Sequence, residues 1–429
     1  MKLSDGILIR NDPALLQRVE EMAPDFWWLE GYFPGAFFGQ RVICNVYLIK
    51  DGRNLLLVDN GISPVMQEKI LALIARYYGE VDSFYMTLTQ GHLDHAGNNE
   101  LIDEVEIEDK HFILNEREMS SLEYTMDWLA DLRSRNEFYP WMEDVSPVLP
   151  VAVEISRHNP QWAEVVVNTI LSLNYPVLRP RRELVEPLYM ADVQPFTFGS
   201  VTLEGWPLGR LVILPDNAHS PGHCSVYDPE YKIMLCGDVT VEINPVLRYS
   251  SVNGLVRTNA LFRRMAEEGY IEKVGDGHRS RSSWGKVLSR FPSHLRDEVA
   301  EGDYVVGKDE CIRFFARFED FHRGQRQAVV DAHASVGTAT VPDIAEALLQ
   351  IDMPAIELMK AMHSTLQAFT YPWRMLCLNV ALEQGCKVIE REGDLPLIEP
   401  PSQLNEEPRV SVPWRGIQGR PPNEPKSLR

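Results

Sequence analysis

The alternation of apolar and polar residues predicts an α/β arrangement at the start of the chain. Two strand-like runs, residues 43–49 and 54–58, flank an Asp-Gly pair, which favours a β-hairpin. Apolar residues at helical spacing follow from residue 63, with serine expected as the N-cap and proline in the first turn. A third strand is predicted at 81–88. This order of elements is typical of an α/β domain.

The middle of the chain has a different pattern. Residues 116–190 carry apolar residues near helical spacing and several prolines, which predicts a helical insertion that covers the site as a lid. Strands are then expected at 196–203, 211–214, 225–227 and 232–236, and a helix near 253–268.

The last part of the chain is predicted to be mainly helical from about residue 305. One helix is expected at 322–334, further helices begin near 341 and 353, and a short strand follows at 386–390. Helices in this order before a small hairpin suggest a winged-helix module. We therefore expect three parts: a first domain over residues 1–300, a winged-helix-like domain over 305–395 and an extended, proline-rich tail over 396–429.

One short segment carries an unusual density of metal-ligand side chains. Residues 87–98 read TLTQGHLDHAGN and place His92, Asp94 and His95 within four positions, directly after the predicted strand. Zinc and similar metals prefer such nitrogen and oxygen ligands. The alternative interpretation is a polar loop with two solvated histidines.

Further motifs downstream decide between these interpretations. They are VDNG at 58–61, HSPGH at 219–223, GD at 237–238 and DGH at 276–278. Together with QGHLDH at 90–95, and in this order, they resemble the motifs of the metallo-β-lactamase superfamily over about residues 40–285. The resemblance implies an αββα sandwich, in which two β-sheets pack face to face with helices outside.

The resemblance also implies roles for individual residues. His92 and His223 match ligands of a first metal position, and Asp94, His95 and His278 match ligands of a second. The remaining assignments concern Asp238 as the carboxylate that bridges two metals, Asp59 as the acid that orients a ligand, and His219 as a supporting residue. Asp94 is also expected to orient the attacking water and to take up its proton.

Position 90 departs from the family pattern. The usual loop is HxHxDH, and here Gln90 stands where the first histidine belongs, as in GOB-type metallo-β-lactamases. A glutamine carbonyl is a weaker zinc ligand than imidazole. We therefore expect one firmly bound Zn²⁺ and a second ion that is labile or absent, with iron or manganese as alternatives.

Composition limits the partners. The chain has 429 residues and a formal net charge of −20, which argues against nucleic-acid binding. The six cysteines are scattered, which predicts reduced thiols, and neither a secretory signal nor a membrane-spanning apolar run is recognised. We expect a cytoplasmic homo-oligomer that does not bind membranes.

The predicted activity is hydrolysis of an ester, lactone, thioester or similar bond by a metal-activated water. The aromatic and apolar segments 1–40 and 116–190 favour a small, partly hydrophobic substrate. Two alternatives remain at this point: an iron-dependent oxygenase on the same fold, and a degenerate, non-catalytic subunit that partners an active paralogue.

Overall fold

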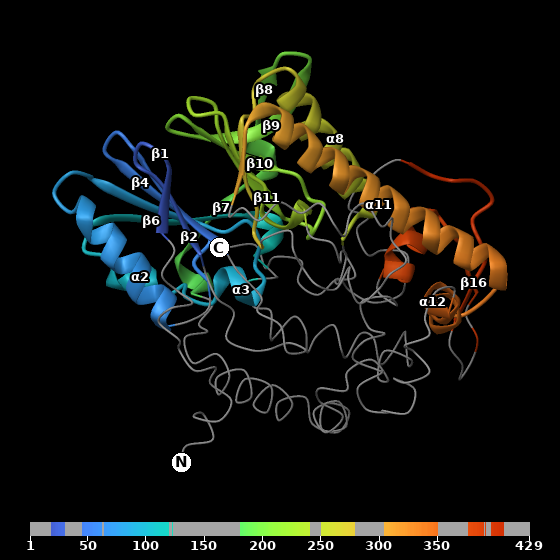
Figure 1. Ribbon diagram of the computed structural model, residues 1–429. Helices are drawn as coiled ribbons and strands as arrows, with labels where there is room; N and C mark the ends of the chain where they lie inside the picture. Colours follow the sequence, from blue (N-terminus) through green and yellow to red (C-terminus); the bar gives the residue numbers. More distant parts are fainter. Residues whose placement is uncertain are drawn as a thin grey trace, which may run out of the picture.

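Two seven-stranded sheets pack face to face in the part of the chain that this computed structural model describes (Figure 1). The structure describes residues 19–30, 45–61, 64–119, 122, 181–240, 250–278, 304–350, 376–389, 391 and 396–406. Helices cover the outer face of each sheet, with α2 on the first and α8 and α11 on the second. The αββα sandwich that the sequence predicts is therefore confirmed.

The first sheet contains its strands in chain order. They are β1 (Val19–Ala23), β2 (Phe26–Glu30), β3 (Asn45–Asp51), β4 (Asn54–Val58), β5 (Ser83–Thr87), β6 (Asp109–Asn115) and β7 (Val185–Leu188). The strands β1 to β4 are antiparallel neighbours, whereas β4 to β7 run parallel. Parallel strands end at one edge of a sheet, so the segments after β4 and β5 leave it side by side.

The second sheet is mostly antiparallel. Its strands are β8 (Gln194–Phe198), β9 (Val201–Leu208), β10 (Leu211–Pro215), β11 (Cys224–Asp228), β12 (Ile233–Leu235), β13 (Lys273–Gly275) and β14 (Val305–Val306). One adjacent pair, β12 with β13, is parallel. The segments that follow these two strands therefore also leave the sheet at a common edge.

Strand β4 shows how the pattern of side chains builds the layers. Leu55 and Leu57 face outward and pack with the helix α2, while Leu56 and Val58 face the second sheet. The central layer between the sheets also contains large buried side chains such as Trp28. A strand buried on both faces is apolar at every position, which is why the run NLLLV does not alternate.

The helices connect the strands and cover the sheets. They are α2 (Pro64–Ile74), η2 (Ala75–Tyr77), α3 (Leu93–Ala96), α4 (Leu101–Glu104), η3 (Glu116–Glu118), η6 (Arg182–Leu184), η7 (Met190–Asp192), η8 (Gly237–Thr240), α8 (Val252–Glu267), α11 (Lys308–Val336) and α12 (Val341–Gln350). Within the described residues no helix is long and apolar enough to cross a membrane. The five described cysteines are all free.

Several predicted boundaries are wrong. The helix expected at 322–334 is the 29-residue α11, which begins fourteen positions earlier at Lys308. The strand expected at 196–203 is two strands, β8 and β9, joined by a tight turn. The helical insertion expected over 116–190 ends earlier, because 185–188 form β7 of the first sheet. Residues 123–180, the bulk of that insertion, lie outside the described residues.

The C-terminal region forms a separate apolar core on the second half of α11. Two further helices, α12 and residues 376–383, and a two-stranded sheet of β15 (Val388–Ile389) and β16 (Leu397–Ile398) contribute to it. The buried Ile398 belongs to this core, so the segment expected to be a tail starts as part of it. The winged-helix interpretation depends on residues 351–375, which lie outside the described part, and stays a prediction.

Candidate metal centre

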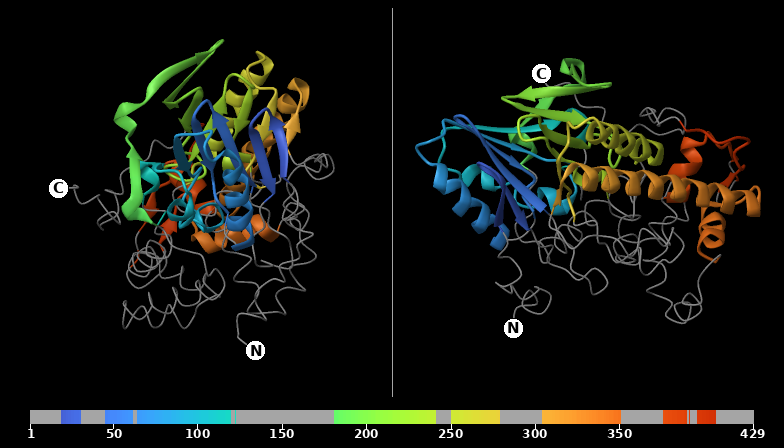
Figure 2. Two further views of the ribbon diagram at one scale, coloured as in Figure 1. Left: turned by 90° about the vertical axis from the view of Figure 1, so that its left-hand side faces the viewer. Right: turned by 45° about the horizontal axis from the view of Figure 1, so that its top comes forward.

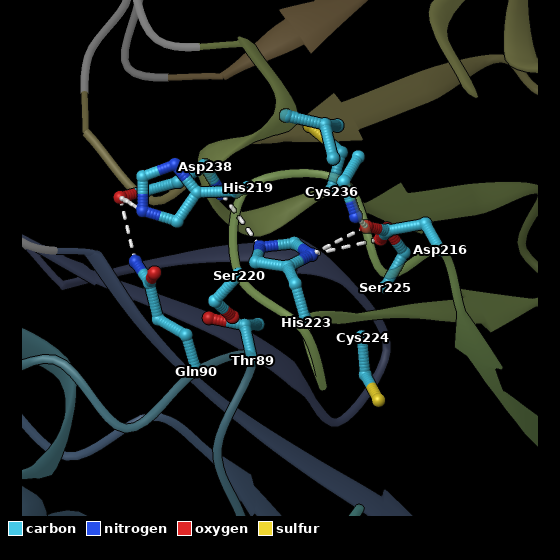
Figure 3. Close-up of polar contacts among 12 residues, drawn as sticks. Thr89, Gln90, Asp216, His219, Ser220, His223, Cys224, Ser225, Cys236 and Asp238 are labelled. Atoms are coloured by element: carbon cyan, nitrogen blue, oxygen red, sulfur yellow. Dashed lines mark hydrogen bonds and ion pairs between the residues drawn. The ribbon is translucent and has the colours of Figure 1, made fainter. Parts of the chain in front are cut away.

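Five segments meet at the shared edge of the two sheets. After β4 comes Asp59, after β5 the segment 89–95, which ends within α3, and between β10 and β11 the loop 216–223. The segments after β12 and β13, 237–238 and 276–278, complete the group. Figure 3 shows Gln90 of the second segment and His219 and His223 of the third around Asp238. The topology thus brings together motifs that lie far apart in the chain.

Two sets of potential ligands share one carboxylate. The first set is His92, His219 and Asp238, and the second is His95, Asp238 and His278; within each set the ligand atoms lie within 4.8 Å of one another. In the second set, Asp238 Oδ1 lies 3.5 Å from His95 Nε2, and Oδ2 lies 3.3 Å from His278 Nε2. In the first set, His219 Nε2 lies 3.4 Å from Asp238 Oδ2 and 3.1 Å from His92 Nδ1. Such an arrangement suits two neighbouring metal positions with Asp238 between them.

Asp59 fixes the orientation of His95. Its Oδ2 lies 2.9 Å from His95 Nδ1, and its oxygens also accept hydrogen bonds from the amide and hydroxyl of Thr89. The proton on His95 is then held on Nδ1, which leaves Nε2 as the ligand atom toward Asp238. Asp59 is buried and has a positive φ of 59°, an uncommon backbone conformation for a residue other than glycine. The strained turn places the carboxylate under the loop that carries the ligands.

His219 and His223 are placed differently from the sequence-based expectation. Both nitrogens of His223 are engaged: Nδ1 lies 2.8 Å from an oxygen of Asp216, and Nε2 accepts a hydrogen bond of 3.0 Å from the backbone N–H of Asp238. His219, in contrast, points its Nε2 at Asp238 (Figure 3). The geometry therefore favours His219 over His223 as a ligand of the first position, and gives His223 the task of holding Asp238.

The protonation states of His223 and His219 follow from the groups around each ring. Burial opposes protonation of His223, but the carboxylate of Asp216 outweighs it and raises the pKa of His223. The N–H of Asp238 nevertheless needs a lone pair on Nε2, so the ring is neutral with its proton on Nδ1. Burial lowers the pKa of His219 well below its usual value, although Asp238 acts against this.

Gln90 lies against the shared carboxylate. Its Nε2 donates a 2.6 Å hydrogen bond to Asp238 Oδ2, and its Oε1 is buried without a hydrogen-bond partner among the described residues. A buried carbonyl oxygen without a partner is costly unless another group satisfies it, and a divalent cation beside Asp238 would do so. The residue thus fits an ion in the first position, as a weak ligand or as a group that holds Asp238.

The electrostatic state of the centre suits a cation. Burial opposes ionisation of Asp238, but the surrounding His278, His95 and His219 lower its pKa well below the usual range. Metal ligation requires an ionised carboxylate and neutral imidazole, which are the states favoured for Asp238 and His219. The donor set therefore fits a divalent metal ion. Asp94 lies on α3 between His92 and His95, but its side chain is outside the described part.

Glu118 joins two of the ligand loops, and sequence reasoning missed it. This fully buried carboxylate accepts hydrogen bonds from the N–H of Gly91 at 2.9 Å, and from the hydroxyl of Ser220 and the N–H of Gly222, both at 2.8 Å. The loop that carries His92 is thereby tied to the loop that carries His219. Nothing in the local sequence around Glu118 signals this role, because all three donors are distant in the chain.

Gly277 permits the segment 276–278 to lie close to Asp238 and His95. A Cβ on Gly277 would lie 2.3 Å from Asp238 Oδ1 and 3.0 Å from a ring carbon of His95. The DGH motif is also held from the first sheet, because Asn45 and Tyr47 donate side-chain hydrogen bonds to the carbonyl of Asp276. The small residue in this motif therefore serves the packing of the two ligand sets.

Comparisons with known proteins agree with this architecture. Residues 39–291, more than half of the chain, match the family model of the metallo-beta-lactamase superfamily. No curated protein matches the chain. Among solved structures, a beta-lactamase domain protein from Burkholderia ambifaria has 14% identity and a TM-score of 0.51, with 93% of this chain and 99% of that chain covered. A metallo-beta-lactamase family protein from Thermus thermophilus has 14% identity and a TM-score of 0.50, with 88% and 100% covered. At such low identity these two show the fold alone, while the family model spans the ligand motifs: the chain belongs to the metallo-beta-lactamase superfamily.

Proposed function

We propose that the protein is a metal-dependent hydrolase that cleaves an ester, lactone, thioester or similar bond of a small, partly hydrophobic substrate. The observation that carries this proposal is the pair of histidine sets around the buried, ionised Asp238. Members of the superfamily are generally metal-dependent hydrolases, which supports the reaction class.

The two positions are proposed to bind metal with unequal strength. Asp94, His95, Asp238 and His278 form the tighter position, which Asp59 supports through His95. The weaker position has His92 and His219, with Gln90 in place of a third histidine. Histidine and aspartate ligands of this kind suit Zn²⁺, with iron or manganese as the alternatives.

The residues around the ion divide the catalytic work. A bound divalent metal lowers the pKa of a coordinated water and polarises the bond under attack. Asp94 is proposed to orient that water and to accept its proton. Asp59 keeps the proton of His95 on Nδ1, and the N–H of Asp238, donated to His223, keeps the shared carboxylate directed into the site. Gln90 holds the other side of that carboxylate.

The decisive experiment combines metal analysis with a substrate panel. Protein purified without added metal is analysed by mass spectrometry and assayed against lactones, thioesters, esters and β-lactams, and His278→Ala is compared with wild type. We expect about one firmly bound zinc ion per chain in wild type, and loss of both metal and activity in the variant. Iron in place of zinc would support an oxygenase instead.

A matched control variant distinguishes loss of a metal ligand from the general effect of removing a histidine. His111 lies on β6, outside both ligand sets, where its ring contacts Glu186 and Asp109 at the surface. His111→Ala should keep metal and activity. If wild type binds no metal even when zinc is supplied, or if His278→Ala hydrolyses every substrate as well as wild type, the proposed function is wrong and the non-catalytic subunit becomes the better interpretation.

A further inference from the structure

We propose that Glu383, which lies in the C-terminal region outside the catalytic sandwich, is a positioning residue for His219 in the metal centre. This inference rests on the proposed function, since it treats His219 as a metal ligand. It assigns the C-terminal region a role in the chemistry in addition to its own packing.

Glu383 caps the N-terminus of α8, a helix of the catalytic domain that is far from it in the sequence. The helix of residues 376–383 ends at this residue, and its carboxylate is buried against the start of α8. One oxygen accepts a hydrogen bond from the hydroxyl of Ser251, and the other accepts from the backbone N–H groups of Val252 and Asn253 at 3.0 and 3.1 Å. The first N–H groups of a helix lack partners within it and attract negative charge, so a buried carboxylate is stable there.

The helix α8 already has an N-cap from its own segment, so the second cap from Glu383 is not needed to start the helix. Ser251 is the N-cap of α8, and its hydroxyl oxygen accepts a 2.8 Å hydrogen bond from the N–H of Gly254. A serine N-cap is normally sufficient for helix initiation. The buried glutamate from 131 residues further along the chain therefore does more than start the helix: it fixes the position of residues 250–254.

Residues 250–254 in turn hold the backbone of His219. The N–H of Ser251 donates a 2.8 Å hydrogen bond to the carbonyl of Ala218, and the hydroxyl of Ser250 donates one to the carbonyl of His219 itself. A Cβ on Gly254 would lie 3.3 Å from the Cα of Ala218, so the helix start packs directly on this segment. The position of the His219 backbone therefore depends on the position of the helix start.

Glu383 is itself held in place by the end of the described chain. The side-chain amide of Asn405 donates a 2.8 Å hydrogen bond to the carbonyl of Glu383, and Asn405 exchanges two further hydrogen bonds with Gln384. Asn253 of α8 also donates to the carbonyl of Asn405. Figure 2 shows this C-terminal region beyond the sandwich, on the half of α11 that is remote from the first sheet.

The contacts from Glu383 through residues 250–254 to His219 matter for function because His219 is proposed to be a metal ligand. His219 must present Nε2 to the same oxygen of Asp238 that His278 approaches, and small shifts of a ligand backbone weaken metal binding. Substitutions of groups that support ligands typically cost about 10–100-fold in metal affinity. Because Glu383 acts through one intervening segment, we expect Glu383→Ala to weaken zinc binding at the position of His219 by about 3- to 10-fold, which is less than the effect of a group that contacts the ligand directly.

A double-mutant cycle tests this inference with zinc affinity as the readout. The dissociation constant of the second zinc ion, at the weaker position of His92 and His219, is measured by zinc titration of full-length wild type, Glu383→Ala, His219→Ala and the double variant, each already loaded with one zinc ion. If Glu383 acts through His219, its substitution has no further effect once His219 is gone. An equal effect in both backgrounds would overturn the proposal, because Glu383 would then act on the centre by another route.

Two more variants separate positioning from loss of stability. Ile344→Ala removes a fully buried apolar side chain from the same C-terminal core but leaves the hydrogen bonds of Glu383 to the start of α8 in place, and it should leave zinc affinity unchanged. Glu383→Gln keeps an acceptor oxygen and should lose less affinity than Glu383→Ala; it also replaces the alanine variant if that one does not fold. If Ile344→Ala weakens zinc binding as much, the inference fails.

The outcomes also distinguish this inference from the proposed function. Wild type that binds no zinc would refute the proposed function, and the inference with it. Wild type that takes up only one zinc ion, or a second zinc ion that His219→Ala binds as tightly as wild type, would refute the ligand role of His219 and the inference that rests on it. Zinc binding that depends on His219 but not on Glu383 would refute the inference alone.

Discussion

His322 on α11 makes the stability of the protein depend on pH in a way that can be measured. Its ring is fully buried, with Nε2 3.3 Å from the carbonyl of Val239 and Nδ1 2.9 Å from the side-chain oxygen of Gln325. Burial lowers the pKa of His322 from 6.5 to about 4, although these two contacts favour the protonated form. At a pH between these two values, His322 is therefore neutral in the folded protein and protonated in the unfolded chain.

The sign and size of the effect follow from proton linkage. Between pH 6.5 and pH 4 the unfolded state binds the proton and the folded state does not, so stability is complete above this window and falls as pH decreases through it. With these two pKa values, the free energy of unfolding decreases by about 2 kcal/mol from pH 7 to pH 5, and by about 3 kcal/mol by pH 4.

The assay compares wild type with His322→Gln, which keeps a donor for the carbonyl of Val239 but does not titrate. Urea unfolding of the metal-free proteins at pH 7 and pH 5 gives the free energies. Other titrating groups are present in both proteins and cancel in the difference. Wild type should lose about 2 kcal/mol more than the variant on acidification. Equal losses in the two proteins would show that His322 is not held neutral by burial.

The remaining predictions concern the supports of the metal centre. Gly277→Ala should abolish zinc binding, because the added methyl lies 2.3 Å from Asp238 Oδ1, whereas Gly79→Ala, whose methyl meets nothing within 4 Å, should retain it in the same titration. Glu118→Gln should destabilise the protein by about 1–3 kcal/mol in urea unfolding, because an amide N–H would face backbone donors; unchanged stability and zinc affinity would contradict its role as a link between loops. Asp59→Asn should weaken zinc binding about 10-fold in chelator competition, and wild-type affinity would show that it does not orient a ligand histidine.

The parts of the fold that the sequence predicts well are those with local signals. The Asp-Gly hairpin between β3 and β4 and the helices α2 and α8 lie close to their predicted positions, because turn residues and apolar spacing are properties of short segments. The ligand motifs also sit at strand ends, as their spacing indicates. Topology then brings them together at the edge of the sheets.

The parts that the sequence does not predict depend on distant contacts. HSPGH contains two histidines, and only the approach of Asp216 and of the Asp238 amide to His223 shows which of them faces the site. Likewise, Glu118 and Glu383 have no motif, since their partners lie on other segments. The apolar pattern underestimates the length of α11 because the first half of this helix packs against a sheet and the second half against another core, so no single apolar stripe marks it.

The shared helix α11 has a consequence for the order in which the protein matures during synthesis. The ligand residues are all made by His278, but α11, about 44 Å long, is made afterwards and covers the outer face of the second sheet. Phe315 and Phe318 of its first half complete that core, so the nascent chain that ends before Lys308 lacks one wall. We therefore expect metal loading to be a late event, which follows release of the C-terminal region from the ribosome.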